Sequence, residues 1–138
     1  VSTANRQLDA IITGSELLSS QYNTPVLAAN RIIGIDGRED VGVAALRCID
    51  LDSREVLWTQ AEYGTAHLIA IGSQVLTLTI PGRVALIDAA AGSYRELAHT
   101  QLPAGTYRAL PALSSSKFIV RDSHSAGRSK LLCVELPH

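Results

Sequence analysis

The sequence lacks the features that several common classes of protein require. It has no excess of basic residues, since 12 Lys and Arg face 13 Asp and Glu. A protein that binds nucleic acid through phosphate contacts normally carries a basic patch or stripe, so we expect no nucleic-acid partner. No apolar run approaches the roughly 20 residues that cross a bilayer, so we expect no membrane span. A charged amino-terminal region followed by an apolar stretch, which marks a secretory signal, is also missing.

Cysteine and histidine are scarce and scattered. The two cysteines, Cys48 and Cys133, occupy the same place in two repeat units, and such positions lie too far apart for a disulfide. We expect both to be small buried hydrophobic residues. No pair of histidines has the i, i+4 spacing of a helical zinc site, and no C-x-x-C accompanies them. We therefore predict no metal site at the four histidines, which are His67, His99, His124 and His138. We also expect Ser123-His124 not to be a nucleophile pair, because neighbours in sequence are not thereby oriented for proton transfer.

Long amphipathic helical patterns are absent as well, which argues against an α/β fold. Short apolar segments alternate with turn signals such as Pro81-Gly82, and within Leu76–Ile80 leucine and isoleucine alternate with threonine. This pattern predicts an all-β protein. The strands are expected at about Pro25–Leu27, Arg31–Ile35, Ala45–Asp50, Glu55–Gln60, His67–Ile71, Gln74–Ile80, Val84–Asp88, Tyr94–His99, Pro111–Leu113, Lys117–Arg121 and Leu131–Glu135, with a further candidate at Asp9–Thr13.

The chain repeats itself. The segment Thr24–Leu51 returns at Leu110–Leu136 with one gap, and Asp36 then matches Asp122. A third unit lies between these copies. Repeats of about 40–45 residues that are rich in short strands are typical of propeller blades. We predict one partial β-propeller domain over residues 1–138, with about three four-stranded antiparallel blades at 20–60, 61–104 and 105–138 and a strand or loop at 1–19.

The number of expected strands is too small for a closed ring. The third unit has three strands, and known propellers close with typically 4–8 blades. Exposed strand edges pair readily with another chain. We therefore expect either a piece of a longer propeller or self-association that completes one. Residues of about 8–13 are a candidate for the missing strand, in the same chain or in a neighbour.

One segment carries a family resemblance. Cys48–Trp58 resembles the tryptophan-docking repeat of quinoprotein-type propellers, roughly A-x-D-x-x-T-G-x-x-x-W, with Asp50, Ser53 and Trp58 in place and Arg54 instead of glycine. The second copy keeps Asp88 and Gly92 but has Glu96 where tryptophan belongs, and the third is reduced to Cys133–Glu135. Residues of about 20–137 are thus similar to the C-terminal blades of bacterial pyrroloquinoline-quinone-like repeat proteins.

The resemblance implies structural roles for these docking residues. The Asp would accept hydrogen bonds from the amides of the following turn, and Trp58 would offer a flat surface to the next blade. Enzymes of the family need a quinone cofactor, a calcium ion held by Glu and Asn side chains, and an Asp general base, and no residue of this chain maps onto the calcium or base motif. We expect a non-catalytic binding or scaffold module without a cofactor, located outside the cytoplasm (periplasmic or secreted). The alternatives are a fragment of a quinone-dependent dehydrogenase and a propeller that binds carbohydrate or another small ligand.

An interaction surface is predicted from exposed Tyr and Arg, which are enriched at binding hot spots. Tyr63 and Tyr107 each precede the first strand of a unit and would share one rim, and Arg108 is a further candidate. Alternatively, the two rings pack the start of their blades. Arg38 belongs to the charged run Asp36–Asp40, for which we expect a solvated hairpin with local ion pairs rather than a calcium loop.

Overall fold

The computed structural model describes residues 16–123 and 127–136, and these residues form an all-β fold. Eleven strands and one short 3-10 turn, Glu39–Val41, are present in this part of the chain. The expected fold class is confirmed. The strands are β1 Val26–Ala28, β2 Arg31–Arg38, β3 Val43–Asp50, β4 Val56–Gln60, β5 Ala66–Ile71, β6 Gln74–Thr79, β7 Arg83–Asp88, β8 Glu96–Gln101, β9 Ala112–Ser114, β10 Lys117–Asp122 and β11 Lys130–Glu135.

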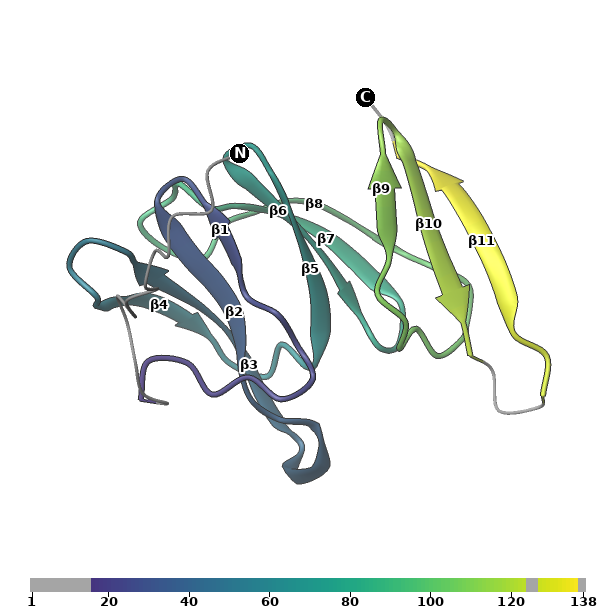
Figure 1. Ribbon diagram of the computed structural model, residues 1–138, viewed down its shortest axis with the longest axis horizontal. Coiled ribbons are helices and arrows are strands. Elements are labelled where there is room, and N and C mark those ends of the chain that lie inside the picture. Colours follow the sequence, from purple (N-terminus) through teal and green to yellow (C-terminus); the bar gives the residue numbers. More distant parts are fainter. Residues whose placement is uncertain (1–15, 124–126, 137–138) are drawn as a thin grey trace, which may run out of the picture.

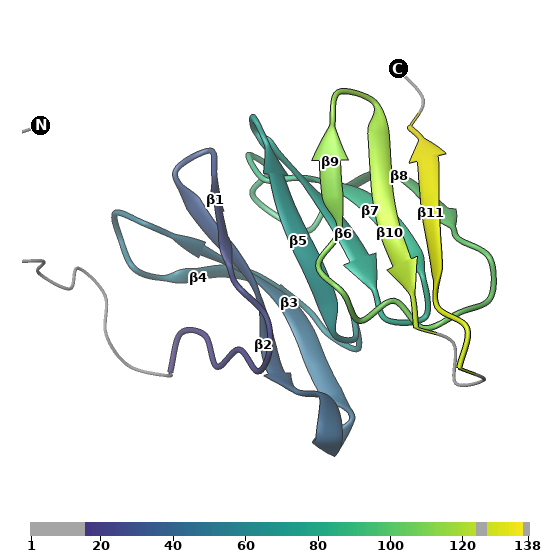
Figure 2. The same ribbon diagram turned by 45° about the vertical axis from the view of Figure 1, so that its right-hand side comes forward.

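Three antiparallel sheets follow one another along the chain. The first has the order β1-β2-β3-β4, the second β5-β6-β7-β8 and the third β9-β10-β11. We call them blades 1, 2 and 3. Blade 2 stands between the other two, with its faces turned toward them (Figures 1 and 2). Each blade is a simple meander, as the repeat predicts, and blade 3 has three strands among the described residues.

The first hairpin is longer than the sequence suggests. The charged run Asp36–Asp40, expected in a hairpin loop, begins within strand β2, since Gly37 pairs with Ala44 and Arg38 with Val43. Gly37 has a φ of 113°, and a Cβ there would lie 2.1 Å from the Val43 carbonyl oxygen. Glycine therefore lets the ladder continue where any other residue would break it.

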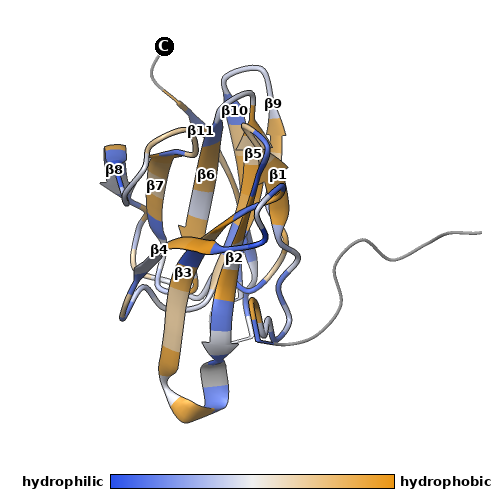
Figure 3. Ribbon diagram, turned by 90° about the vertical axis from the view of Figure 1, so that its left-hand side faces the viewer, coloured by the Kyte–Doolittle hydropathy of each residue, from blue (hydrophilic) through white to orange (hydrophobic). Residues whose placement is uncertain are grey.

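Two apolar cores separate the blades, and Figure 3 shows the strands of the first two sheets largely in apolar colours. Between blades 1 and 2, Trp58 is 8% exposed, and its ring meets that of Tyr94 edge-on with centroids 5.7 Å apart. Tyr107 and Phe118 are each 1% exposed and belong to the core between blades 2 and 3. Blade stacking thus buries most of the large side chains.

The prediction that both cysteines are buried is half wrong. Both thiols are free, and Cys48 is buried whereas Cys133 is exposed. Cys48 pairs with Ile33 and Cys133 with Ile119, so the two cysteines hold the same register position. That position faces the next blade: Cys48 and Ile33 belong to the core against blade 2. Among the described residues no blade follows blade 3, and Cys133 is left in solvent.

Residues 16–25 cover the face of blade 1 that points away from blade 2. A Cβ at Gly34 would lie 2.5 Å from Leu18, and Arg47 donates a 2.7 Å hydrogen bond to the Leu17 carbonyl. Arg47 also forms a 2.6 Å ion pair with Asp36. No helix in the described part of the chain is long and apolar enough to cross a membrane. The expected strand at Asp9–Thr13 and the residues His124 and His138 lie outside the described residues.

Candidate strand-binding site

A cleft of about 790 Å³ separates the outer parts of blades 2 and 3. Strands β6, β7 and β8 line one side of it, and β9, β11 and the residues after them line the other. The lining is mainly apolar, and Leu76, Val84, Leu86, Ala98, Leu113 and Val134 contribute to it. The corresponding position between blades 1 and 2 is filled by Trp58 and its neighbours.

The strand register explains this difference. Trp58 on β4 pairs with Cys48, and Ala98 on β8 pairs with Leu86, the residue of blade 2 that matches Cys48. Ala98 therefore occupies the place of Trp58. The Glu96 that the sequence alignment puts there is two residues too early.

The turn before β8 is longer by two residues. The Asp50 N–H donates to the Glu55 carbonyl at 3.0 Å, and the Asp88 N–H donates to the Arg95 carbonyl at 3.0 Å. Glu55 is five positions after Asp50, and Arg95 is seven positions after Asp88. Ala98 therefore presents a methyl group to blade 3, at the position where Trp58 presents an indole ring to blade 2. The cleft is the space that the smaller side chain leaves unfilled.

The edge of β11 opens beside this cleft. Strand β11 pairs with β10 along its whole length, and no described strand pairs with its other edge. Val134, Glu135 and Leu136 reach the cleft, while Leu131 is 75% exposed. Blade 3 therefore presents unpaired backbone groups next to an apolar cavity, which is the arrangement that accepts an added strand.

The main charged cluster of blade 2 holds the ring of Tyr94 beside Trp58, and of its members His99 also lines the cleft. Glu96 accepts hydrogen bonds from Arg83 at 2.6 Å and from Tyr94 at 2.7 Å, and His99 Nδ1 lies 2.6 Å from it. Burial raises the pKa of Glu96, but the bonds from Arg83 and Tyr94 outweigh it and leave this pKa below its usual value. Burial, followed by the bond to Glu96, raises the pKa of Tyr94. These groups satisfy one another and hold the ring against which Trp58 packs.

Two of the predicted interaction residues, Tyr63 and Tyr107, pack against the cores between the blades. Tyr107 is 1% exposed and donates a 2.8 Å hydrogen bond to the Pro103 carbonyl, so its placement on an exposed rim is wrong. Tyr63 is half-buried and its hydroxyl lies 2.6 Å from Thr77 Oγ1. Both rings pack at the start of their blades because the preceding loop turns them inward, which is the alternative that the sequence left open.

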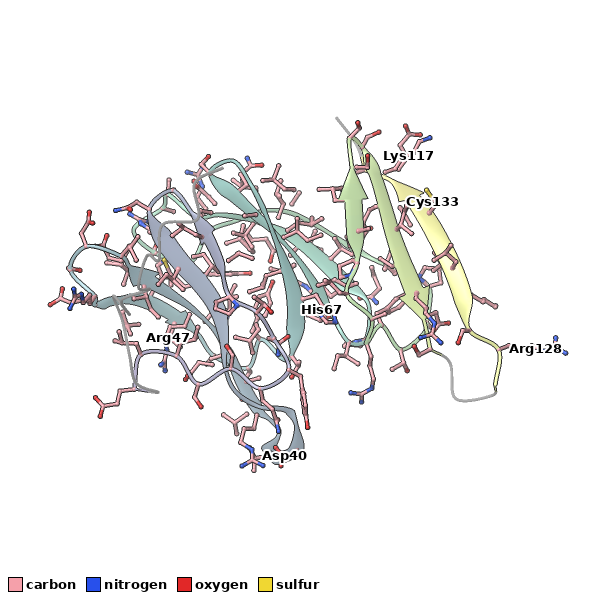
Figure 4. The ribbon with its side chains drawn as sticks, viewed as in Figure 1. Asp40, Arg47, His67, Lys117, Arg128 and Cys133 are labelled. Atoms are coloured by element: carbon pink, nitrogen blue, oxygen red, sulfur yellow. The ribbon has the colours of Figure 1, made fainter. Side chains whose placement is uncertain are left out.

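The two predicted arginines lie on different segments, Arg38 at the end of β2 and Arg108 in the connection between blades 2 and 3. Arg38 is exposed and forms an ion pair of 2.5 Å with Asp40, and the hydrogen bond from Arg38 lowers the pKa of that carboxyl. Figure 4 shows Asp40 at the end of the long hairpin of blade 1, well away from His67 on blade 2. Arg108 is exposed, and its carbonyl lies 2.9 Å from His67 Nε2.

The two docking aspartates end strands β3 and β7 and accept hydrogen bonds from the turns that follow. Asp50 Oδ1 accepts the backbone N–H groups of Asp52 at 3.0 Å and Ser53 at 2.8 Å. Asp88 Oδ1 accepts the Ala90 N–H at 2.9 Å. Gly92 is exposed, and a Cβ there would meet nothing within 4 Å.

Ala98 is the site residue that the sequence analysis missed, because alignment of the repeats by Asp88 ignores the length of the turn. Within the described part of the chain, no group of three or more His, Cys, Asp or Glu side chains could hold a metal ion. The acids Asp36 and Asp40 are engaged by Arg47 and Arg38. These residues therefore do not fit the calcium site that the resemblance implies for the family's enzymes.

No family model and no curated protein matches the sequence. Among solved structures, a europium-containing methanol dehydrogenase matches 81% of this chain with a TM-score of 0.61 and 14% sequence identity. The three sheets therefore share the propeller-blade fold of the matched part of that dehydrogenase. An identity this low shows the fold alone, and the chain spans 22% of the length of that dehydrogenase.

Proposed function

We propose that these blades form a non-catalytic binding module, which accepts an extended protein segment as the fourth strand of blade 3. One observation supports this proposal: the unpaired edge of β11 opens beside a cleft of about 790 Å³. In strand addition, main-chain hydrogen bonds supply affinity and pockets for alternate side chains supply specificity. The role needs no cofactor.

The chemistry of the site defines the segment that it would accept. Side chains of an added strand alternate between the two faces of the blade. Those on one face would enter the cleft, where Leu86, Ala98 and Val134 favour apolar groups. We therefore expect an extended segment with at least one bulky aliphatic side chain and no charge at the position that enters the cleft.

The likeness to the dehydrogenase supports a second candidate function, in which the blades are part of a pyrroloquinoline-quinone-dependent enzyme. Such a protein would take its cofactor residues from outside the described part of the chain. Titration of a longer protein that contains those residues with pyrroloquinoline quinone and Ca²⁺ should then give an absorbance change, whereas under the binding role we expect none. By the same resemblance we propose an extracytoplasmic location, which cell fractionation would test.

Selection from a library of displayed peptides tests the binding role directly. Peptides that bind the 138-residue chain should slow hydrogen exchange of the β11 amides more than that of other strands. The Ala98→Trp variant fills the cleft and should lose binding at least tenfold, whereas Leu97→Trp, at an adjacent position that is 40% exposed, should retain it. A library that yields no binder, or binders that leave β11 unprotected, would contradict the proposal.

A further inference from the structure

The segment before blade 1 repeats the connections between blades. The Gly37 N–H donates to the Ser19 carbonyl at 2.9 Å, the Ile80 N–H donates to the Thr65 carbonyl at 3.2 Å, and the Ser123 N–H donates to the Thr106 carbonyl at 2.8 Å. The three donors hold one register position. Cys48, Leu86 and Cys133 pair across their strands with Ile33, Leu76 and Ile119. Each donor lies four residues after one of these three pairing partners.

A second contact supports the same equivalence. The Ser19 N–H donates to Asp36 Oδ1 at 2.8 Å, and the Thr106 N–H donates to Asp122 Oδ1 at 2.8 Å. Asp36 and Asp122 also match in the sequence repeat. Ser19 is therefore the counterpart of Thr106, a residue that connects the outer strand of one blade to the inner strand of the next.

The spacing before these connecting residues locates a missing strand. Gln60 on β4 and Thr100 on β8 hold equivalent places, opposite Leu46 and Val84. Gln60 lies five residues before Thr65, and Thr100 lies six before Thr106. Counting five or six residues back from Ser19 leads to Gly14 or Thr13. Trp58 and Ala98 lie two residues before Gln60 and Thr100, so the equivalent position before Ser19 is Ile12 or Ile11.

We infer that residues 9–14 supply a fourth strand to blade 3 of a second copy of this chain. The inference rests on the proposed function, whose site it fills. Within one molecule the strand cannot reach β11, since Glu16 lies on blade 1 and blade 2 separates blade 1 from blade 3 (Figures 1 and 2). The two residue steps from Gly14 to Glu16 span at most about 7 Å.

The sequence of this strand suits a place between two blades. Consecutive residues of a strand point to opposite faces, so Ile11 and Ile12 would bury one side chain against blade 1 of their own chain and the other in the partner's cleft. Reciprocal exchange by a twofold axis joins two sets of three blades into six, within the range of known closed propellers. Cys133 and Ile119 on the outward face of blade 3 would then meet blade 1 of the partner.

Light scattering on the full chain over a range of concentrations tests the inference. We expect a species of twice the 14.7 kDa chain mass, and at least a tenfold slower reaction of Cys133 with a thiol reagent when the dimer forms. Ile11→Asp/Ile12→Asp should be a folded monomer with a reactive Cys133. The control Thr3→Asp/Ala4→Asp, outside the proposed strand, should remain a dimer.

A synthetic peptide of residues 6–15 makes the test independent of whether the variant folds. Added in excess to the native chain, it should dissociate the dimer and protect the β11 amides, whereas the same peptide with Asp at positions 11 and 12 should not. A native chain that is monomeric at every concentration, or a dimer that is unaffected by both the variant and the peptide, would overturn the inference. If library peptides still protect the β11 amides after either of these results, the proposed binding role stands without the strand exchange. If the library peptides do not protect them, the binding role and the strand exchange both fail.

Discussion

Trp58 and Ala98 hold the same register position with opposite consequences, and this pair locates the candidate site. Trp58 closes the contact between blades 1 and 2 through Tyr94, whereas Ala98 leaves a cleft of about 790 Å³ in the next contact. The sequence repeat identifies Trp58 as a docking residue. It does not identify Ala98, because a two-residue difference in turn length moves the alignment and only strand pairing reveals it.

Trp58→Ala should lower the free energy of unfolding by about 3–5 kcal/mol, since truncation of a buried aromatic side chain removes transfer energy and leaves a cavity. Urea unfolding followed by circular dichroism measures this change without tryptophan fluorescence. Trp58→Phe is the matched control. It keeps a ring against Tyr94 and removes the buried indole Nε1, which has no hydrogen-bond partner, so its loss should be much smaller. Equal losses in the two variants would show that the ring contact contributes little.

The Cys48 thiol makes a pH-dependent contribution to stability. Burial, the largest cause, raises its pKa to about 11. Below its ordinary pKa the thiol is neutral in both states. Between that value and about pH 11 the unfolded thiol ionises while the folded one remains neutral, so the free energy of unfolding falls as pH rises. Cys48→Ala should make the decline between pH 9 and 11 shallower, and urea midpoints measured across this range would show it. Parallel curves for the two proteins would refute the expectation.

At the scale of elements, all eleven strands could be predicted from the sequence, because short apolar runs and turn residues alternate cleanly. The bounds differ by one to three residues. The largest differences are at Gly37, where a positive φ extends the hairpin, and at β8, whose start is delayed by the longer turn. The way in which the connections bind the hairpins could not be predicted, since it depends on hydrogen bonds between segments distant in sequence.

Asp122 tests the importance of these connections. Its side chain is 6% exposed and accepts the Thr106 N–H, so Asp122→Ala leaves that amide without its partner. An unsatisfied buried donor costs about 1–3 kcal/mol, and urea unfolding should show a loss of this size. Lys117→Ala, on the same strand but exposed, is the control and should change stability little. If Asp122→Ala is as stable as the control, the connection is not held by this carboxylate.

At the scale of the whole molecule, the three blades differ in how completely they are covered. Residues 16–25 and blade 2 cover the two faces of blade 1, and blades 1 and 3 cover those of blade 2. Among the described residues, blade 3 is covered on one face only, and one edge of β11 is unpaired. The repeat count predicts this asymmetry, but only the structure shows that it coincides with the cleft.

This asymmetry should appear as unequal local stability. Regions with few buried contacts and exposed backbone hydrogen bonds open at lower free energy than the core, so in a dilute, monomeric sample the amides of β9–β11 should exchange at least tenfold faster than those of β5–β7. Native-state hydrogen exchange with mass spectrometry measures both sets at once. Raising the protein concentration serves as the internal control, because a strand added by a second copy should slow β11 and leave β5–β7 unchanged. Equal exchange in blades 2 and 3 of the dilute chain would mean that blade 3 is stable without a fourth strand, which would remove the energetic reason for strand capture.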